Sequence, residues 1–150
     1  MGEAEAPLRW AEAVAARRDA RRRAVSMLYQ ADVTGTRPSD VASTWFAEGG
    51  DADVPDFARQ LVEGVERSLG RIDAVISRHL EGWTIDRLAA VDRTILRVAV
   101  FELLHRPDTP VAVAVAEAVA AAKELSTEAS GRFVNGVLGR IAREELERRA

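Results

Sequence analysis

Five arginines stand close together near the start of the chain and form its densest group of charged side chains. They are Arg17, Arg18, Arg21, Arg22 and Arg23. On a helix, Arg17 and Arg21 form one column and Arg18 and Arg22 the next, and both columns continue into apolar residues. Guanidinium groups one helical turn apart repel one another. Binding of a nucleic acid would offset this repulsion, because its phosphates neutralise the arginines and release their counterions. The run predicts a basic edge that binds nucleic acid; the alternative is a frayed, solvated N-terminal extension.

A second unusual segment is Phe133–Leu138, where Asn135 and Gly136 interrupt an apolar helical run. Both residues are weak helix formers, together costing about 1 to 1.5 kcal/mol relative to alanine. Glycine permits the close approach of a backbone or a ligand, and an asparagine amide can pair with the edge of a base. The alternative is tight helix packing, with Asn135 capping a neighbouring helix and Phe133 in the core. The residues alone fit both interpretations.

The reactive groups that a catalytic or metal site would need are scarce. The sequence has no cysteine, which excludes disulfides, thiolate zinc sites and a cysteine nucleophile. The two histidines, His79 and His105, fall on different segments and form no recognisable metal-ligand pattern. The sequence also has no glycine-rich phosphate loop and no nucleophile elbow. We therefore expect no catalytic residue, no metal and no cofactor.

Composition narrows the class of protein further. The 150 residues are 47% hydrophobic and 30% charged, which is typical of one globular domain and too polar for a membrane span. The start of the chain lacks the features of a secretory signal, so we expect a cytoplasmic protein. Because the net charge is −3, attraction for nucleic acid depends on local clusters of charge. The prediction is one domain over residues 1–150, with residues 1–16 as a flexible N-terminal arm.

Apolar periodicity predicts the elements that must position these groups. Residues 57–80 carry an apolar side chain at every third or fourth position, which predicts one helix of about seven turns. Residues 91–104 are apolar almost all round and predict a central helix, and residues 133–146 predict an amphipathic one. In residues 111–125 valine alternates with alanine as in a strand, but strong helix formers continue without a turn, so we predict a helix. The expected fold is all-α.

Several of these segments match a known family in order and spacing, over roughly Arg17 to Ile141. The arginine motif comes first, and the two most specific blocks are residues 91–97 (VDRTILR) and 133–138 (FVNGVL). Together they resemble the NusB family of bacterial transcription antitermination factors. Ala116 and Ala129 depart from the pattern, because many relatives carry a polar side chain at these two positions.

The resemblance implies a compact bundle of about six to seven helices without catalytic activity. It also implies binding to single-stranded, boxA-type RNA in ribosomal RNA leaders, together with a small-subunit ribosomal protein called NusE in this role. That assembly, with other Nus factors, modifies the elongating RNA polymerase. Some family members form homodimers, so a second copy of the chain is a further partner to test.

The resemblance also carries functional roles onto particular positions. The residues that it places at the RNA are Arg17, Arg18, Arg21, Tyr29, His79, Phe133 and Asn135. The residues that it places at the partner protein are Asp92, Arg93 and Glu102. The arginines would contact phosphates and bases, while the rings and the amide would stack on bases or pair with their edges. For Asp92 the alternative is an ion pair with a nearby arginine.

A different function remains open from the sequence. Similar helical domains stand at the front of ribosomal RNA cytosine methyltransferases, although here no cofactor-binding sheet follows before Ala150. A helical module that binds only proteins, or that dimerises through apolar faces, would use its arginines merely for solubility. A preference for boxA-type RNA over an unrelated oligonucleotide discriminates the two classes.

Overall fold

The structure is a computed structural model that describes residues 2–47 and 56–147, with side chains described from Arg9 to Leu146. Every secondary-structure element in this part of the chain is a helix, which confirms the all-α prediction. The elements are α1 (Gly2–Thr34), α2 (Pro38–Ala47), α3 (Asp56–Arg67), α4 (Leu69–Arg78), the short 3-10 helix η1 (Ile85–Arg87), α5 (Ala90–His105), α6 (Val111–Leu125) and α7 (Glu128–Glu147). None of the described helices is both long enough and apolar enough to cross a membrane.

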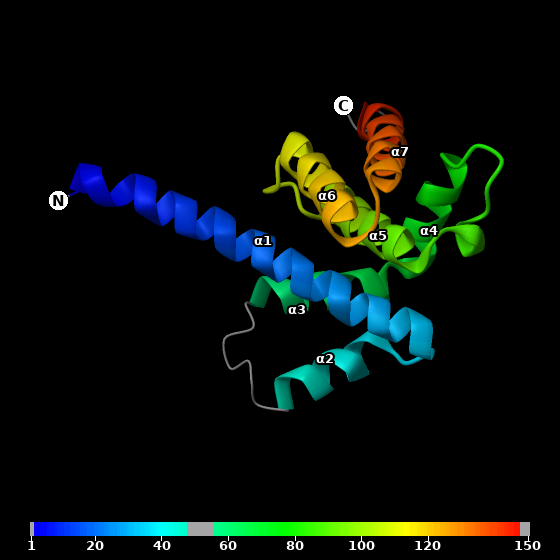
Figure 1. Ribbon diagram of the computed structural model, residues 1–150, viewed down its shortest axis with the longest axis horizontal. Helices are drawn as coiled ribbons and strands as arrows, with labels where there is room; N and C mark the ends of the chain where they lie inside the picture. The colour runs from blue at the N-terminus through cyan, green and yellow to red at the C-terminus, as the bar shows by residue number, and fades with distance from the viewer. Residues whose placement is uncertain (1, 48–55, 148–150) are drawn as a thin grey trace.

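Helix α5 lies at the centre of the bundle (Figure 1) and contacts α1, α3, α4, α6 and α7. Its apolar side chains are buried on nearly every side, as its composition predicts. Gly64 of α3 lets that helix approach closely, because a Cβ there would overlap the ring of Phe101. Two acidic residues of α5, Asp92 and Glu102, are buried among these apolar neighbours and must therefore be paired.

Helix α1 has two halves with different surroundings. From Ala20 onward it supplies core residues such as Ala24, Met27 and Leu28, and packs against α2, α3 and α5. Residues 9–19 are exposed, and this half projects beyond the body of the bundle (Figure 1). The predicted arm is thus helical from Gly2 and continuous with α1, while its flexibility stays a prediction.

The prediction of one helix over residues 57–80 is wrong in one respect. The apolar stripe is buried as expected, but the chain forms two helices, α3 and α4, that meet at Ser68. Ser68 leaves the helical conformation, with φ −108° and ψ 13°. Gly70, a poor helix former, follows two residues later. The stripe therefore continues around a bend rather than along a straight helix.

Helices α6 and α7 pack closely along each other and carry the second half of the candidate site. The helix predicted for residues 111–125 is confirmed as α6. Helix α7 begins at Glu128, where the side chain of Thr127 accepts a hydrogen bond from the backbone N–H of Ser130 at 2.9 Å and caps the helix. Gly131 allows the close packing, because a Cβ there would lie 2.6 Å from Cγ of Lys123.

Candidate functional site

The arginine cluster spans the boundary between the exposed and the buried half of α1. Arg17 and Arg18 lie in the exposed half, whereas Arg21 lies one turn further along and is buried. The sequence predicts that all of these arginines lie at one exposed edge. In the structure some are exposed and others are buried, because carboxylates of α5 and α6 pack against one side of α1.

Arg21 forms a buried ion pair with Glu102 of α5. The guanidinium Nε and Nη2 donate to the two carboxylate oxygens at 2.9 to 3.2 Å, and the hydroxyl of Thr109 donates a third bond to Oε1 at 3.4 Å. The two side chains are 9% and 1% exposed. Neither the predicted RNA contact of Arg21 nor the predicted partner contact of Glu102 has a surface position here, because each side chain is enclosed by the other's helix.

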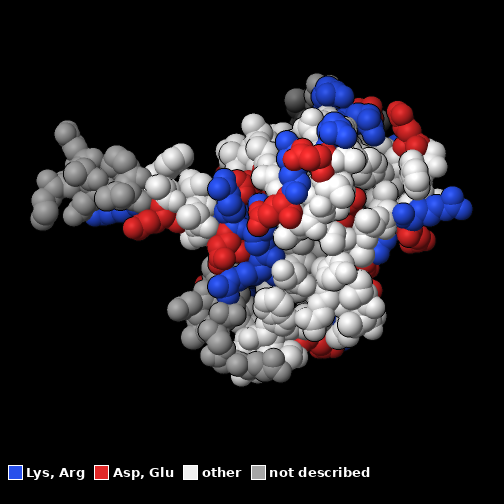
Figure 2. Space-filling model, viewed as in Figure 1, with Lys and Arg blue, Asp and Glu red and all other residues white. Residues whose placement is uncertain are grey.

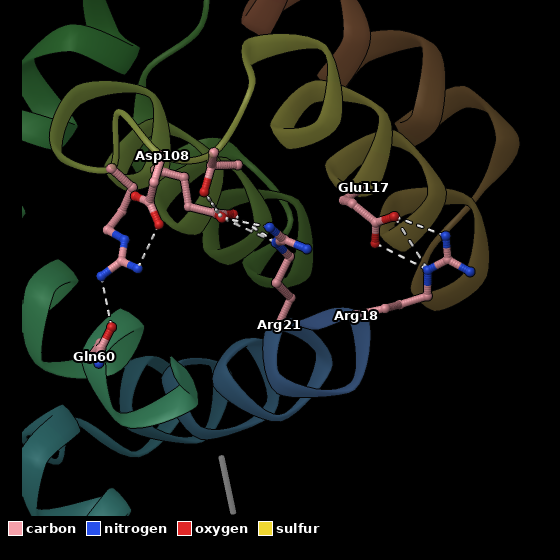
Figure 3. Close-up of polar contacts among 8 residues, drawn as sticks. Arg18, Arg21, Gln60, Asp108 and Glu117 are labelled. Carbon is pink, nitrogen blue, oxygen red and sulfur yellow. Dashed lines mark hydrogen bonds and ion pairs between the residues drawn. The ribbon is translucent and has the colours of Figure 1, made fainter. Parts of the chain in front are cut away.

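Arg18 forms a similar pair with Glu117 of α6, but at the surface (Figure 3). Nε lies 3.2 and 3.3 Å from the two carboxylate oxygens, and Nη2 donates to Oε1 at 2.9 Å. The hydrogen bond from Arg18 lowers the pKa of Glu117, against the burial of the carboxyl, which raises it. Arg18 is 56% exposed and Glu117 only 11% exposed. The guanidinium is therefore open to solvent while its partner is largely covered.

Arg17 has different contacts from its neighbours. Its guanidinium carbon lies 3.9 Å from the centre of the Phe57 ring, within cation–π distance, and Arg21 and Arg106 stand 5.3 Å from the same centre. Among the described side chains Arg17 forms no ion pair. Phe57 is itself a core residue, so its ring holds the guanidinium end of an otherwise exposed side chain against the bundle. Arg17 thus presents a positive charge that no carboxylate of the described chain neutralises.

The face where α1 meets α6 is a mixture of both charges. Figure 2 shows basic and acidic side chains side by side across it, rather than a continuous positive patch. Arg22 contributes a further pair, donating from Nε to Glu124 at 3.1 Å. The sequence does not indicate these pairs, because the carboxylates lie about 80 to 100 residues away along the chain. Their only signal is an acidic residue inside an otherwise apolar helix, as at Glu102.

The predicted contacts on α7 lie on the far side of α6 from these arginines (Figure 1). Phe133 is half-buried and packs against the core, while Asn135 is exposed. Asn135 lines an open hollow of about 590 Å³ together with the outer face of α6. The other residues of this hollow are Ala112, Val115, Ala116, Val119, Ala120 and Lys123. A Cβ at Gly136 would meet nothing closer than 3.8 Å, so close packing does not explain that glycine.

Tyr29 and His79 lie in different settings. Tyr29 is exposed on α1, three turns and about 16 Å beyond Arg18 on the same stripe. His79 is buried at the end of α4, with its ring nitrogens 3.4 Å from Glu145 and 3.6 Å from Glu144 of α7. Its backbone carbonyl accepts a hydrogen bond from Arg140 at 2.8 Å. The structure thus places His79 against the C-terminal half of α7, and not at the exposed edge that the prediction requires.

The predicted partner contacts in the first turn of α5 are largely covered. Asp92 accepts a hydrogen bond from the hydroxyl of Ser130 at 3.0 Å through Oδ2, so its partner is a serine rather than an arginine. Its second oxygen is buried and has no hydrogen-bond partner among the described residues. Arg93 donates to Asp32 of α1 at 2.6 Å and to backbone carbonyls of the preceding loop. Both residues therefore join helices within the bundle.

The described residues hold no group of three or more histidines or carboxylates placed to bind a metal ion. The chemistry that this arrangement supports is recognition. It combines guanidinium groups that pair with α6 and an amide, that of Asn135, which lines an open apolar hollow on α6.

Comparison with known proteins adds a family and several relatives. A model described as the NusB family matches residues 18–143. The transcription antitermination protein NusB of Saccharopolyspora erythraea is 49% identical over 131 residues, which cover 85% of this chain and 86% of the relative. The structure of NusB from T. maritima matches with a TM-score of 0.78 and 39% identity, over 85% of this chain and 91% of that one. A structure of antitermination factors NusB and NusE in complex with dsRNA matches with a TM-score of 0.76 and 32% identity, over 85% of this chain and 96% of the other.

Proposed function

This chain belongs to the NusB family, and we propose that it is a transcription antitermination factor that binds RNA together with the ribosomal protein NusE. The RNA is a single-stranded, boxA-type segment, as the family resemblance implies. The complex, with other Nus factors, then modifies elongating RNA polymerase. The chain contributes binding surfaces and no catalytic step, and it acts in the cytoplasm, where bacterial transcription takes place.

One observation carries this proposal. The chain matches a chain of a solved complex of antitermination factors NusB and NusE with dsRNA, at 32% identity and over 85% of its own length. The geometry supports the RNA side of the proposal independently. Arg18 and Arg22 of α1 pair with carboxylates of α6, and Asn135 of α7 lines a hollow on the same helix, although they are more than a hundred residues apart in the sequence.

The RNA contacts that the structure supports best are the members of the predicted set that are not buried. Arg17, Arg18, Tyr29 and Asn135 are exposed, and Phe133 is half-buried. The guanidinium of Arg18 is open to solvent on one side, so a phosphate can approach it and compete with the carboxylate of Glu117. Each such contact releases counterions and makes binding salt-dependent. Asn135 can then pair with the edge of a base, and the rings of Tyr29 and Phe133 can stack on bases.

The buried members of the predicted set act indirectly. Arg21 fixes α1 against α5 through Glu102, and His79 joins α4 to the end of α7. We place both as positioning residues, since neither has an exposed side chain that could reach RNA. Their substitution would change RNA binding only by displacing the helices that carry the exposed contacts.

For the partner protein, the candidate surface is the first turn of α5 around Asp92. One oxygen of this carboxylate has no hydrogen-bond partner among the described residues and can accept a hydrogen bond from a partner protein. Asp92→Asn keeps the size of the side chain and removes its charge, so it should weaken association with the ribosomal protein and spare RNA binding by the isolated chain. Equal loss of both activities would contradict a separate partner surface.

The decisive experiment is a titration of boxA-type RNA with the full chain, with and without the ribosomal protein, at moderate salt. We expect tighter binding than to an oligonucleotide of the same composition in scrambled order, and a further gain in affinity when the partner is present. Sedimentation of the free chain at the same concentrations reports whether a homodimer competes. Equal affinity for both RNAs, in both conditions, would overturn the proposal.

A further inference from the structure

We propose that a groove beside Trp10 binds one unpaired nucleobase of the RNA, next to the phosphates that Arg17 and Arg18 contact. The inference rests on the proposed function and extends it to a specific subsite. The groove measures about 220 Å³ and lies between the projecting half of α1 and the start of α6. Trp10, Val14 and Arg17 of α1 line one side of it, and Asp108, Val113 and Glu117 line the other.

The lining residues of α1 form a single face of the helix. They recur at spacings of three and four, from Trp10 through Val14 and Arg17 to Arg21. The face therefore leads without interruption from the exposed indole to the arginine edge. The match to the family begins only at residue 18, so Trp10, Val14 and Arg17 belong to a part of this chain outside that match.

The side chains of this groove suit a flat heteroaromatic ring joined to a phosphate. Trp10 is 71% exposed, although an indole is among the largest apolar surfaces that a protein can offer. Val14 and Val113 are also exposed and add apolar walls on two sides. A base can stack on the indole while its polar edge stays in water, and the adjoining phosphate can reach Arg17.

The charges in the groove favour an anion at Arg17. Both carboxylates that line it are engaged within the chain: Glu117 with Arg18 and Asp108 with Arg106, at 2.9 and 3.1 Å. Arg17 has no such partner among the described residues and is held over Phe57 instead. Its positive charge is therefore available to a ligand, which argues for a nucleotide rather than an apolar peptide.

The test compares Trp10→Ala with a matched control, Trp83→Ala. Trp83 is also exposed, at 58%, but it lies in the loop after α4, away from the groove. Each variant is titrated with a boxA-type RNA that carries several unpaired nucleotides on either side, at one salt concentration. We expect Trp10→Ala to weaken binding roughly tenfold and Trp83→Ala to leave it unchanged. Trp10→Phe, which retains a ring, should recover most of the loss.

A second measurement identifies the base. Each flanking nucleotide is replaced in turn by an abasic unit, and the affinity loss is measured with the wild-type chain and with Trp10→Ala. We expect one position at which the loss seen with the wild type disappears in the variant, because both changes remove the same contact. The indole fluorescence quenched by the intact RNA should also be restored by the abasic unit at that position.

Three outcomes would overturn the subsite. One is equal RNA affinity for wild type and Trp10→Ala, with equal abasic losses at every position. Another is weaker binding of the ribosomal protein with RNA affinity unchanged, which would assign the groove to a protein. The last is a change of oligomeric state on sedimentation of Trp10→Ala, which would assign it to a second copy of the chain. Failure of the proposed function is distinct from all three, because the wild-type chain would then show no preference for the boxA-type RNA.

Discussion

Two arginines three residues apart on α1 form the same kind of ion pair in opposite surroundings. Arg21 and Glu102 lie in the core, at 9% and 1% exposure, while Arg18 and Glu117 lie at the surface, at 56% and 11%. Both pairs use Nε and Nη2 of the guanidinium, and the short bond measures 2.9 Å in each. Their difference is therefore burial rather than bonding geometry.

Burial decides what each pair can do. In the core a guanidinium without its carboxylate would be a desolvated charge, so the inner pair cannot open without a large cost. At the surface water can solvate the guanidinium of Arg18, which is 56% exposed, and a phosphate can take the place of the carboxylate. We infer that the inner pair holds α1 in position and that the outer pair exchanges with RNA.

The largest effect is expected from Glu102→Ala, which leaves Arg21 buried without a partner. The free energy of unfolding should fall by about 3 to 5 kcal/mol. Urea denaturation measures this, with Glu117→Ala as the matched control, for which we expect a loss several times smaller. Similar losses for the two variants would contradict the division into a structural pair and an exchangeable pair.

The next effect is expected from Arg18→Ala on RNA binding. The loss of one phosphate contact should weaken binding by about 3- to 10-fold at moderate salt and reduce the slope of log affinity against log salt by about one. The free energy of unfolding should change little. Arg23→Ala is the control, because Arg23 belongs to the same run but bonds to Asp19 on its own helix at 2.8 Å. An unaltered slope for Arg18→Ala would exclude its phosphate contact.

A smaller effect in the opposite direction is expected from Glu117→Gln. The amide is a weaker partner for Arg18 than the carboxylate, so a phosphate competes with it more easily. RNA affinity should rise by about 2- to 5-fold, measured at the same salt concentration as for the wild type. Glu124→Gln, which affects the pair with Arg22, tests whether the loss of any acidic charge has the same result. Weaker RNA binding by Glu117→Gln would show that Glu117 supports the contact between Arg18 and RNA rather than competing with the phosphate.

The smallest effect concerns pH and stability. Arg18 lowers the pKa of Glu117 below its ordinary value of 4.5, so the carboxylate is stabilised in the folded state. The contribution of this carboxylate to stability is complete above the pKa that Glu117 has in the unfolded chain. It is lost as the pH falls through the lower pKa that Glu117 has in the folded chain. The difference in unfolding free energy between wild type and Glu117→Gln should be small and constant near neutrality and shrink in acid below about pH 4.5. A difference in unfolding free energy that grew in acid would show that the pKa of Glu117 is raised, not lowered, in the folded chain.

Much of the fold was predictable from local patterns. The helical character of residues 91–104, 111–125 and 133–146 follows from their periodicity and composition, and the structure confirms it. The bend at Ser68 was not predictable, because the apolar stripe continues across it in step. Apolar periodicity indicates only which side chains face the core. A bend that leaves the same side chains facing the core therefore does not change the periodicity.

The candidate site was predictable only in part. The arginine cluster and Asn135 are the residues that the sequence singles out, and the structure brings Arg18 and Asn135 to the same helix, α6. Their role in binding RNA stays a prediction. Their pairing with carboxylates was not predictable, nor was the burial of His79 and Glu102. The sequence around Trp10 indicates no binding site, because the walls that Pro110 and Val113 supply lie about 100 residues away along the chain.

The amino-acid sequence by itself determined which segments are helical and which of them carries a concentration of positive charge, since both depend on neighbours within a few turns. Only the tertiary structure decided which of those charges reaches solvent. Arg21 meets a carboxylate 81 residues away, and Arg18 meets one 99 residues away. The depth of each pair depends on how the helices pack, and that depth sets the electrostatic cost of separating the charges.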